Sequence, residues 1–357
     1  MSASVLHPHH PFRIFLITGL ITVLSLGYVG IELGTTALLT ALVLVVIEIT
    51  FSFDNAIINA KILTSMSRLW QTLFMTVGIF IAVFGMRLIF PVVIVMLTSG
   101  LGAGEVIDLA LNNPERYGQA LHDSHVPIAA FGGMFLLMLC LHFFFDPGRK
   151  VQWIDIIEKP LQRLGKWWAY ALTSFVVLVT LTLLPFNHHP GETFTAGLIG
   201  IVTYMIVHGL AELFTRQQER SEKGSANKIV IRTGMAGFMS FIYLEILDAS
   251  FSLDGVIGAF AITQDVVLIA IGLGIGALWV RSLTLFMVRR HVLGAYRYLE
   301  HGAHYTIGIL ASMMLLGLFI DIPEAVAGLA GLVVVGLSIA SSIAATKRDE
   351  LERQQRK

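Results

Sequence analysis

Long apolar stretches constrain this chain most, because about 18 consecutive apolar residues suffice for a helix to cross a bilayer. Ten such stretches follow one another, at about 12–31, 35–60, 69–98, 126–145, 168–187, 194–215, 234–262, 265–288, 303–320 and 324–345. Only 13% of the residues are charged, whereas a soluble domain has about 25%. The sequence therefore predicts an all-α membrane protein with about ten transmembrane helices.

The basic residues between these stretches are divided unevenly. If both termini are cytoplasmic, 21 of the 24 lysines and arginines fall in cytoplasmic segments, and only Arg116 falls on the opposite side. The positive-inside rule predicts such a division. We therefore expect a multi-pass protein of the bacterial cytoplasmic (inner) membrane, with both termini inside. The formal net charge is zero, so no overall field favours nucleic acid as a partner; the lipid bilayer is the expected partner, and the oligomeric state stays open.

A short motif occurs twice in the chain, as FSFDNAII at residues 51–58 and as FSLDGVIG at residues 251–258. Three further features recur in the same order. They are an acid six residues before the motif aspartate (Glu48 before Asp54, Asp248 before Asp254), an arginine in the next predicted helix (Arg87, Arg281), and His-x-x-His after that (His122/His125, His301/His304).

The motif helices are the second and the seventh, so they are expected to run in opposite directions. This arrangement predicts a 5+5 inverted-topology repeat within a single transmembrane domain spanning residues 1–357, with repeats at about 12–187 and 194–345 and a cytoplasmic tail at 346–357. Secondary transporters commonly have this plan, with the substrate site near the midplane where the repeats meet.

Ionisable side chains deep in membrane spans are costly and indicate function. Five acids and two arginines are expected there, which leaves an excess of three negative charges for a cation or for protons to offset. Oxygen ligands of this kind suit Mg²⁺, Ca²⁺ or Mn²⁺. The candidate metal ligands are Glu48, Asp54, Asn55, Glu245, Asp248 and Asp254, with Arg87 and Arg281 as charge-compensating residues. Structural ion pairs are the alternative role for both arginines.

Helical spacing places Glu48, Ser52 and Asn55 on one face, and Glu245, Asp248, Ser252 and Gly255 on the matching face of the seventh helix. Asp54 lies about 240° around a regular helix from Glu48. Both carboxylates would reach one ion only if the helix unwinds near residues 52–55. Gly255 and Gly258 favour a similar break in the second half.

The two His-x-x-His pairs are expected on one helical face each, near a membrane boundary. We interpret His122, His125, His301 and His304 as helix-end groups, with accessory metal ligation as the alternative. Neither pair has the His-Glu-x-x-His pattern of metalloproteases, and no nucleophile motif is present, so the sequence does not predict an enzyme.

In the motifs Glu48-x5-Asp54-Asn55 and Asp248-x5-Asp254 the chain resembles the TerC family of integral membrane proteins, within the wider LysE-like transporter group. The intramembrane arginine after each motif also fits the family. Gly255 stands where the family usually has serine, and no proline follows, so the second half departs from the pattern. Ten spans are more than many members have, and the chain resembles an enlarged branch.

The resemblance implies an exporter of a divalent metal cation, Mn²⁺ first and Ca²⁺ second, with the ion as transported substrate and no cofactor. Since no nucleotide-binding motif is present, an ion gradient would drive it. Members are also associated with tellurite resistance, so a membrane-protein assembly or stress-resistance factor is one alternative. Transport of a small cationic organic substrate is another, because an acidic midplane suits that cargo too.

Overall fold

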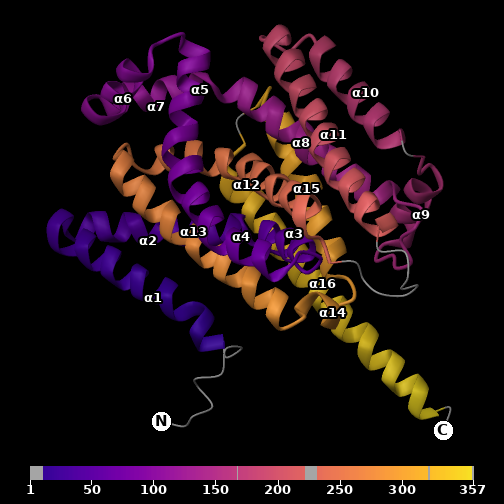
Figure 1. Cartoon of the computed structure of the whole chain (residues 1–357). Helices are drawn as coiled ribbons and strands as arrows, with labels where there is room; N and C mark the ends of the chain where they lie inside the picture. Colours follow the sequence, from indigo (N-terminus) through magenta and orange to yellow (C-terminus); the bar gives the residue numbers. More distant parts are fainter. Residues whose placement is uncertain (1–10, 167, 222–230, 321, 356–357) are drawn as a thin grey trace, which may run out of the picture.

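The computed structural model of the chain describes residues 11–166, 168–221, 231–320 and 322–355, and every regular element in these ranges is helical (Figure 1). Seven of its helical segments are long and apolar enough to cross a membrane: Ile14–Phe51, Arg68–Ser99, His125–Phe145, Pro190–Arg220, Gly234–Phe260, Val266–Arg289 and Gly328–Gln355. The chain is therefore an all-α, multi-pass membrane protein. The count of ten spans stays a prediction, because α10 (Ala169–Leu183) is shorter and α1 and α2 belong to one segment.

The first segment turns back on itself. Its parts are α1 (Pro11–Tyr28), the π-helical η2 (Val29–Leu33) and α2 (Gly34–Phe51). Gly34 has φ of 89°, a left-handed conformation that glycine adopts without strain, and there the chain reverses. In Figure 1, α1 and α2 lie side by side at the left edge.

Six helical elements follow α2, and the first of them contains most of the first repeated motif. They are α3 (Phe53–Leu63), α4 (Arg68–Phe80), the π-helical η3 (Ile81–Ile89), α5 (Phe90–Ser99), α6 (Ala103–Asn112) and α7 (Pro114–Asp123). Individual residues set the ends of two of these helices. Gly100, with φ of 72°, terminates α5. The Asn113 side chain caps the start of α7 by accepting a hydrogen bond from the N–H of Arg116.

A group of four helices lies on one side of the molecule (Figure 1). They are α8 (His125–Phe145), α9 (Asp155–Arg163), α10 and α11 (Pro190–Ser221). The elbow between α8 and α9 is pinned by Arg149, whose Nη2 lies 3.1 Å from the fully buried carboxylate of Glu158. Burial lowers the pKa of Arg149, and Glu158 opposes that shift.

The second half contains α12 (Gly234–Ile262), α13 (Val266–Arg289), the short α14 (Val292–Ala295), α15 (Leu299–Leu316) and α16 (Glu324–Gln355). Asp265 caps α13 by accepting from the N–H groups of Val267 and Leu268 at 2.9 and 3.0 Å. The end of α16 extends away from the body in Figure 1, so the predicted tail is helical as far as Gln355.

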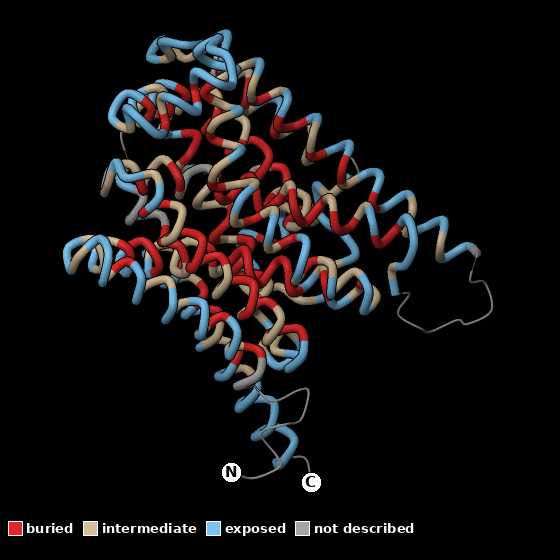
Figure 2. The backbone as a smooth tube through the Cα atoms, turned by 60° about the vertical axis from the view of Figure 1, so that its left-hand side comes forward, coloured by how far each residue is buried: buried red, intermediate tan, exposed pale blue. Residues whose placement is uncertain are grey.

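Buried residues concentrate in the central helices, whereas buried and exposed residues alternate along the outer helices (Figure 2). Exposed side chains include large apolar ones such as Val23 (70%), Ile31 (83%) and Leu97 (79%). Water-soluble monomers rarely expose apolar surface on this scale. The bilayer is the solvent that this surface fits.

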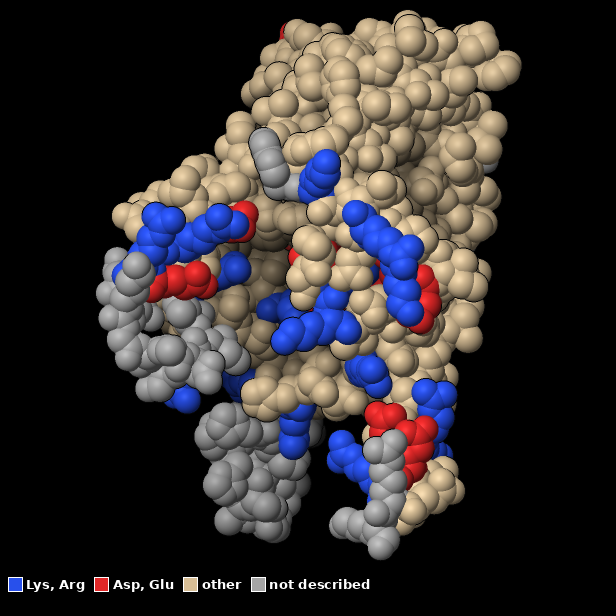
Figure 3. Space-filling view, turned by 90° about the vertical axis from the view of Figure 1, so that its right-hand side faces the viewer, with Lys and Arg blue, Asp and Glu red and all other residues tan. Residues whose placement is uncertain are grey.

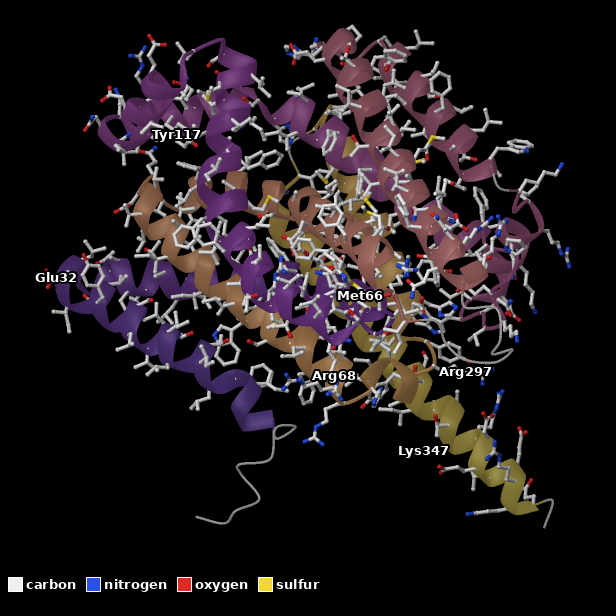
Figure 4. The ribbon with its side chains drawn as sticks, viewed as in Figure 1. Glu32, Met66, Arg68, Tyr117, Arg297 and Lys347 are labelled. Carbon is white, nitrogen blue, oxygen red and sulfur yellow. The ribbon has the colours of Figure 1, made fainter. Side chains whose placement is uncertain are left out.

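The basic segments gather at one end. Lys61 of α3 pairs with Glu300 of α15 at 2.8 Å, and the main chain of Arg232 pairs with that of Ser65 and Ser67. Figure 4 shows Arg68, Arg297 and Lys347 toward that end, and Glu32 and Tyr117 toward the other. On the face drawn in Figure 3, lysine and arginine side chains gather over the lower half, while the upper part is mostly uncharged.

Candidate functional site

Two buried arginines lie at the centre of the helix bundle, each paired with acids of its own half of the chain. Arg87 of η3 is 6% exposed and forms an ion pair with Glu48 of α2. Arg281 of α13 is 3% exposed and binds Glu245 at 3.2 Å and also Asp248, both from α12. Three of the predicted metal ligands are therefore engaged by the two arginines.

The two arginines also bind across the halves in a reciprocal way. Arg87 Nε donates to the main-chain oxygen of Leu273 in α13 at 3.1 Å, the helix that carries Arg281. Arg281 Nη1 donates to the main-chain oxygen of Phe74 in α4 at 2.9 Å, on the segment that carries Arg87. Each arginine thus joins its own acid to the opposite half.

Two glycines make this close packing of the charged groups feasible. A Cβ atom at Gly78 of α4 would collide with Arg281 and Glu245, and a Cβ atom at Gly276 of α13 would collide with the side chain of Glu48. Each glycine lies in one half and makes room for charged groups of the other.

Two amides converge on the same acid. Asn55 Nδ2 donates to Asp248 Oδ1 at 2.8 Å, and Asn59 Nδ2 donates to the same oxygen at 2.6 Å. Asn59, which is 2% exposed, was not among the predicted site residues. Its signal in the sequence is an amide one helical turn beyond Asn55, on the same face of an otherwise apolar helix.

Among the described residues, the helices that carry the cluster depart from regular α-helix at two places, both in the first half. Ser52, with φ of −99° and ψ of 13°, separates α2 from α3 within the predicted range, and its hydroxyl donates to Glu48 Oε1 at 3.1 Å. The expected break at Gly255 was wrong, since α12 continues unbroken from Gly234 to Ile262. The second irregularity is η3, a π-helical segment of nine residues that carries Arg87. Such segments often mark functional sites.

Two small cavities lie at the cluster and share the walls formed by Glu48, Ser52 and Phe251. One, of about 20 Å³, is also lined by Asn55, Asp248, Ser252 and both arginines, so the two predicted polar faces do meet across it. The other, of about 30 Å³, is lined by Glu48 and Asp54 together, with α15 and α16 forming its far side. We call it the carboxylate chamber.

Asp54 differs from the other described acids because no arginine within the described ranges lies against it. It is 3% exposed, its Oδ1 accepts from the N–H of Asn55 at 2.9 Å, and its Oδ2 has no hydrogen-bond partner among the described residues. Further buried oxygens without a partner are Asn55 Oδ1, Asn59 Oδ1 and Ser252 Oγ. Burying such groups unpaired is costly, and all four are hard oxygen donors of the kind that binds divalent cations.

A much larger cavity, of about 1030 Å³, adjoins the chamber on the side of α7 and the α15–α16 connection. Its walls are mostly apolar, with a polar stripe formed by Glu115, Gln119, His122 and His125. We call it the outer cavity. His122 and His125 were expected on one helix, which was wrong: His122 lies in the last turn of α7, which ends at Asp123, and His125 begins α8 after Ser124.

The other histidine pair lies in the first turns of α15, among the basic segments. His301 Nε2 is 2.9 Å from the main-chain oxygen of Val151 and 3.5 Å from Glu158 Oε2. His304 Nδ1 is 2.8 Å from the main-chain oxygen of Glu300, and its ring stacks on Phe143. Both imidazoles are engaged by the protein, in keeping with helix-end groups.

The predicted metal ligands that the structure describes do not come together as one metal-binding group. Within the described ranges, no three His, Cys, Asp or Glu side chains are close enough to hold a metal ion together. The side chain of Asp254, the second motif aspartate, lies outside the described residues. The site therefore consists of an arginine–carboxylate network, two asparagines, and Asp54 in the carboxylate chamber.

These features define a polytopic α-helical membrane protein with an ionisable cluster buried at the centre of its bundle. The chain belongs to the family described as Protein of unknown function (DUF475), whose sequence model matches residues 53–349. Neither the curated proteins nor the solved structures contain a match to it.

Proposed function

We propose that this protein is a membrane transporter that exports a divalent metal cation, with Mn²⁺ as the first candidate and Ca²⁺ as the second. The observation that carries the proposal is Asp54, a buried carboxylate with no cationic partner among the described residues, which lines the carboxylate chamber together with Glu48. A charge in the membrane interior without a counter-ion is costly. A transported cation would offset that cost for part of the cycle.

The charge balance of the cluster supports a cation as the cargo. The four described acids Glu48, Asp54, Glu245 and Asp248 outnumber the two buried arginines, which leaves two formal negative charges. Asp254 would add a third. Carboxylate, amide and hydroxyl oxygens together suit hard divalent ions, and the resemblance to the TerC family supports Mn²⁺ or Ca²⁺ among them.

The proposal includes ten transmembrane helices in a 5+5 inverted repeat. Its support is the reciprocal packing: each arginine binds its own acid and a carbonyl of the opposite half, and Gly78 and Gly276 play matching roles. The histidine pairs support it too, since His122 and His125 line the outer cavity, whereas His301 and His304 lie among the basic segments. Two halves related in this way can rock around a central site.

Both termini are expected in the cytoplasm, and the segment around Asn113 on the opposite side. The reason is the positive-inside rule together with the gathering of the basic segments at one end. Reporter fusions at Lys357 and next to Asn113 would measure the orientation. A tag at Lys357 that is accessible from outside intact cells would contradict it.

Transport itself is tested by measuring cell content of Mn, Ca, Mg, Zn, Fe and Co with and without the protein. We expect the protein to lower the content of one divalent metal, most strongly when that metal is supplied in excess. Unchanged content of all six would contradict metal export. It would favour the assembly or stress-resistance role, in which the acids serve only as structural groups.

A second candidate is export of a small organic cation, and the outer cavity is the observation that favours it. A volume of about 1030 Å³ with mostly apolar walls is far larger than a metal ion needs, and it falls at the upper end of the usual range for small-molecule pockets. Glu115, on its polar stripe, would meet the positive charge. Competition of organic amines with the metal for export separates the two candidates.

A further inference from the structure

The outer cavity and the carboxylate chamber are separated by very little protein. Among the described residues, only Thr50 and Phe51, the last two residues of α2, line both. The chamber holds Asp54 and Glu48, and the outer cavity holds the polar stripe of α7. These two residues therefore form the described part of the wall between the two cavities.

The ring of Phe51 is seated directly on Gly328 of α16. A Cβ atom at Gly328 would collide with ring atoms Cδ1 and Cε1, so the ring occupies the space that any other residue would fill. Around this contact, Gly328 and Leu332 line the chamber, and Leu329 lines the outer cavity. The Phe51–Gly328 contact thus joins α2 to α16 at the boundary between the chamber and the outer cavity.

We propose that Phe51, resting on Gly328, is the outer gate of the carboxylate chamber, and that displacement of its ring admits the cation to the outer cavity. Phe51 directly precedes the Ser52 break, so a small change at that break would move the ring without unfolding α2 or α3. The role of Phe51 as a gate rests on the proposed transport function. Whether Phe51 blocks access to the chamber can be tested without measuring transport.

Cys140 is the only cysteine and is buried, so a Cys140→Ala background leaves single introduced cysteines as the only reactive thiols. Thr306→Cys reports on the chamber, because Thr306 lines it and not the outer cavity. Gln119→Cys reports on the outer cavity alone. A membrane-impermeant cationic thiosulfonate is added on the side from which Gln119→Cys reacts, and both labelling rates are measured.

With Phe51 intact, we expect Thr306→Cys to react about ten- to a thousandfold more slowly than Gln119→Cys, as for an open state populated at about 0.1–10%. Phe51→Ala should remove most of that difference and leave the rate at Gln119→Cys unchanged. Phe53→Ala is the matched control. It removes a ring that lines the chamber but not the outer cavity, so Thr306→Cys should stay slow.

Two results would overturn the gate: equal rates at both cysteines with Phe51 present, or no acceleration by Phe51→Ala. If Phe51→Ala does not accumulate in the membrane, Phe51→Leu shortens the side chain more conservatively, and failure to accelerate labelling then counts equally against the gate. These outcomes are separable from transport. If the content of no metal changes but the labelling rates are as expected, the chamber is gated for another cargo. If a metal is exported but both cysteines are labelled at equal rates, the gate alone is rejected.

Discussion

Replacing Asp54 by asparagine is expected to abolish cation export while the amount of protein in the membrane stays normal. The substitution keeps the size of the side chain and removes its charge, which a hard divalent ion requires from its ligands. In the described part of the chain no arginine pairs with Asp54 and its Oδ2 has no partner, so removing this buried charge should be neutral or stabilising. The measurements are cell metal content and quantified membrane protein, side by side.

The control for Asp54→Asn is Glu32→Gln, which removes an exposed carboxylate in η2 at the edge of the molecule (Figure 4). It should change neither export nor protein level. Full export by the Asp54→Asn variant would contradict the assignment of this residue to the transport site. A fall in protein level would instead mean that Asp54 serves folding. The repeated motif extends the same expectation to Asp254→Asn.

Much of the helical framework could be predicted from hydropathy alone. The stretch predicted at 126–145 is α8 (His125–Phe145), and that at 265–288 is α13 (Val266–Arg289). Apolar runs of this length have one stable form in lipid, a helix that satisfies its own backbone. Capping residues such as Asp265 then fix the ends.

The departures from regular helix could not be predicted in the same way. The sequence pointed to unwinding near Ser52 and also near Gly255, but only the first occurs, and η3 had no sequence signal at all. A break or a π-turn depends on what the neighbouring helices pack into the gap. At Arg87 that is Glu48 on one side and the carbonyl of Leu273 on the other.

The candidate site was predicted as a list of residues rather than as an arrangement. Helical spacing correctly grouped Glu48, Ser52 and Asn55 on one face, and they line one cavity. It could not say which acids the arginines would engage, because that depends on how the two halves meet in space. For the same reason Asn59 was missed, although its bond to Asp248, at 2.6 Å, is shorter than the 2.8 Å bond of the predicted Asn55 to the same oxygen.

Replacing Arg281 by glutamine is expected to lower the amount of folded protein strongly, in contrast to Asp54→Asn. Arg281 is 3% exposed, lies 3.2 Å from Glu245, and stacks at 3.8 Å over the ring of Phe74. Its loss would leave Glu245 and Asp248 buried without their cation, at a cost of about 3–5 kcal/mol. The measurements are the quantity of protein in the membrane and its thermal unfolding midpoint in detergent.

A second substitution tests whether the loss comes from the unpaired acid. Adding Glu245→Gln to Arg281→Gln should restore part of the protein, because the uncompensated charge next to Asp248 is then removed. Adding Glu48→Gln instead should restore none, since Glu48 is paired with Arg87 and not with Arg281. Equal rescue by both acids would mean that only total charge matters and that the pairing does not. Normal accumulation of Arg281→Gln alone would contradict a structural ion pair, and would place Arg281 with Asp54 among the groups that serve transport.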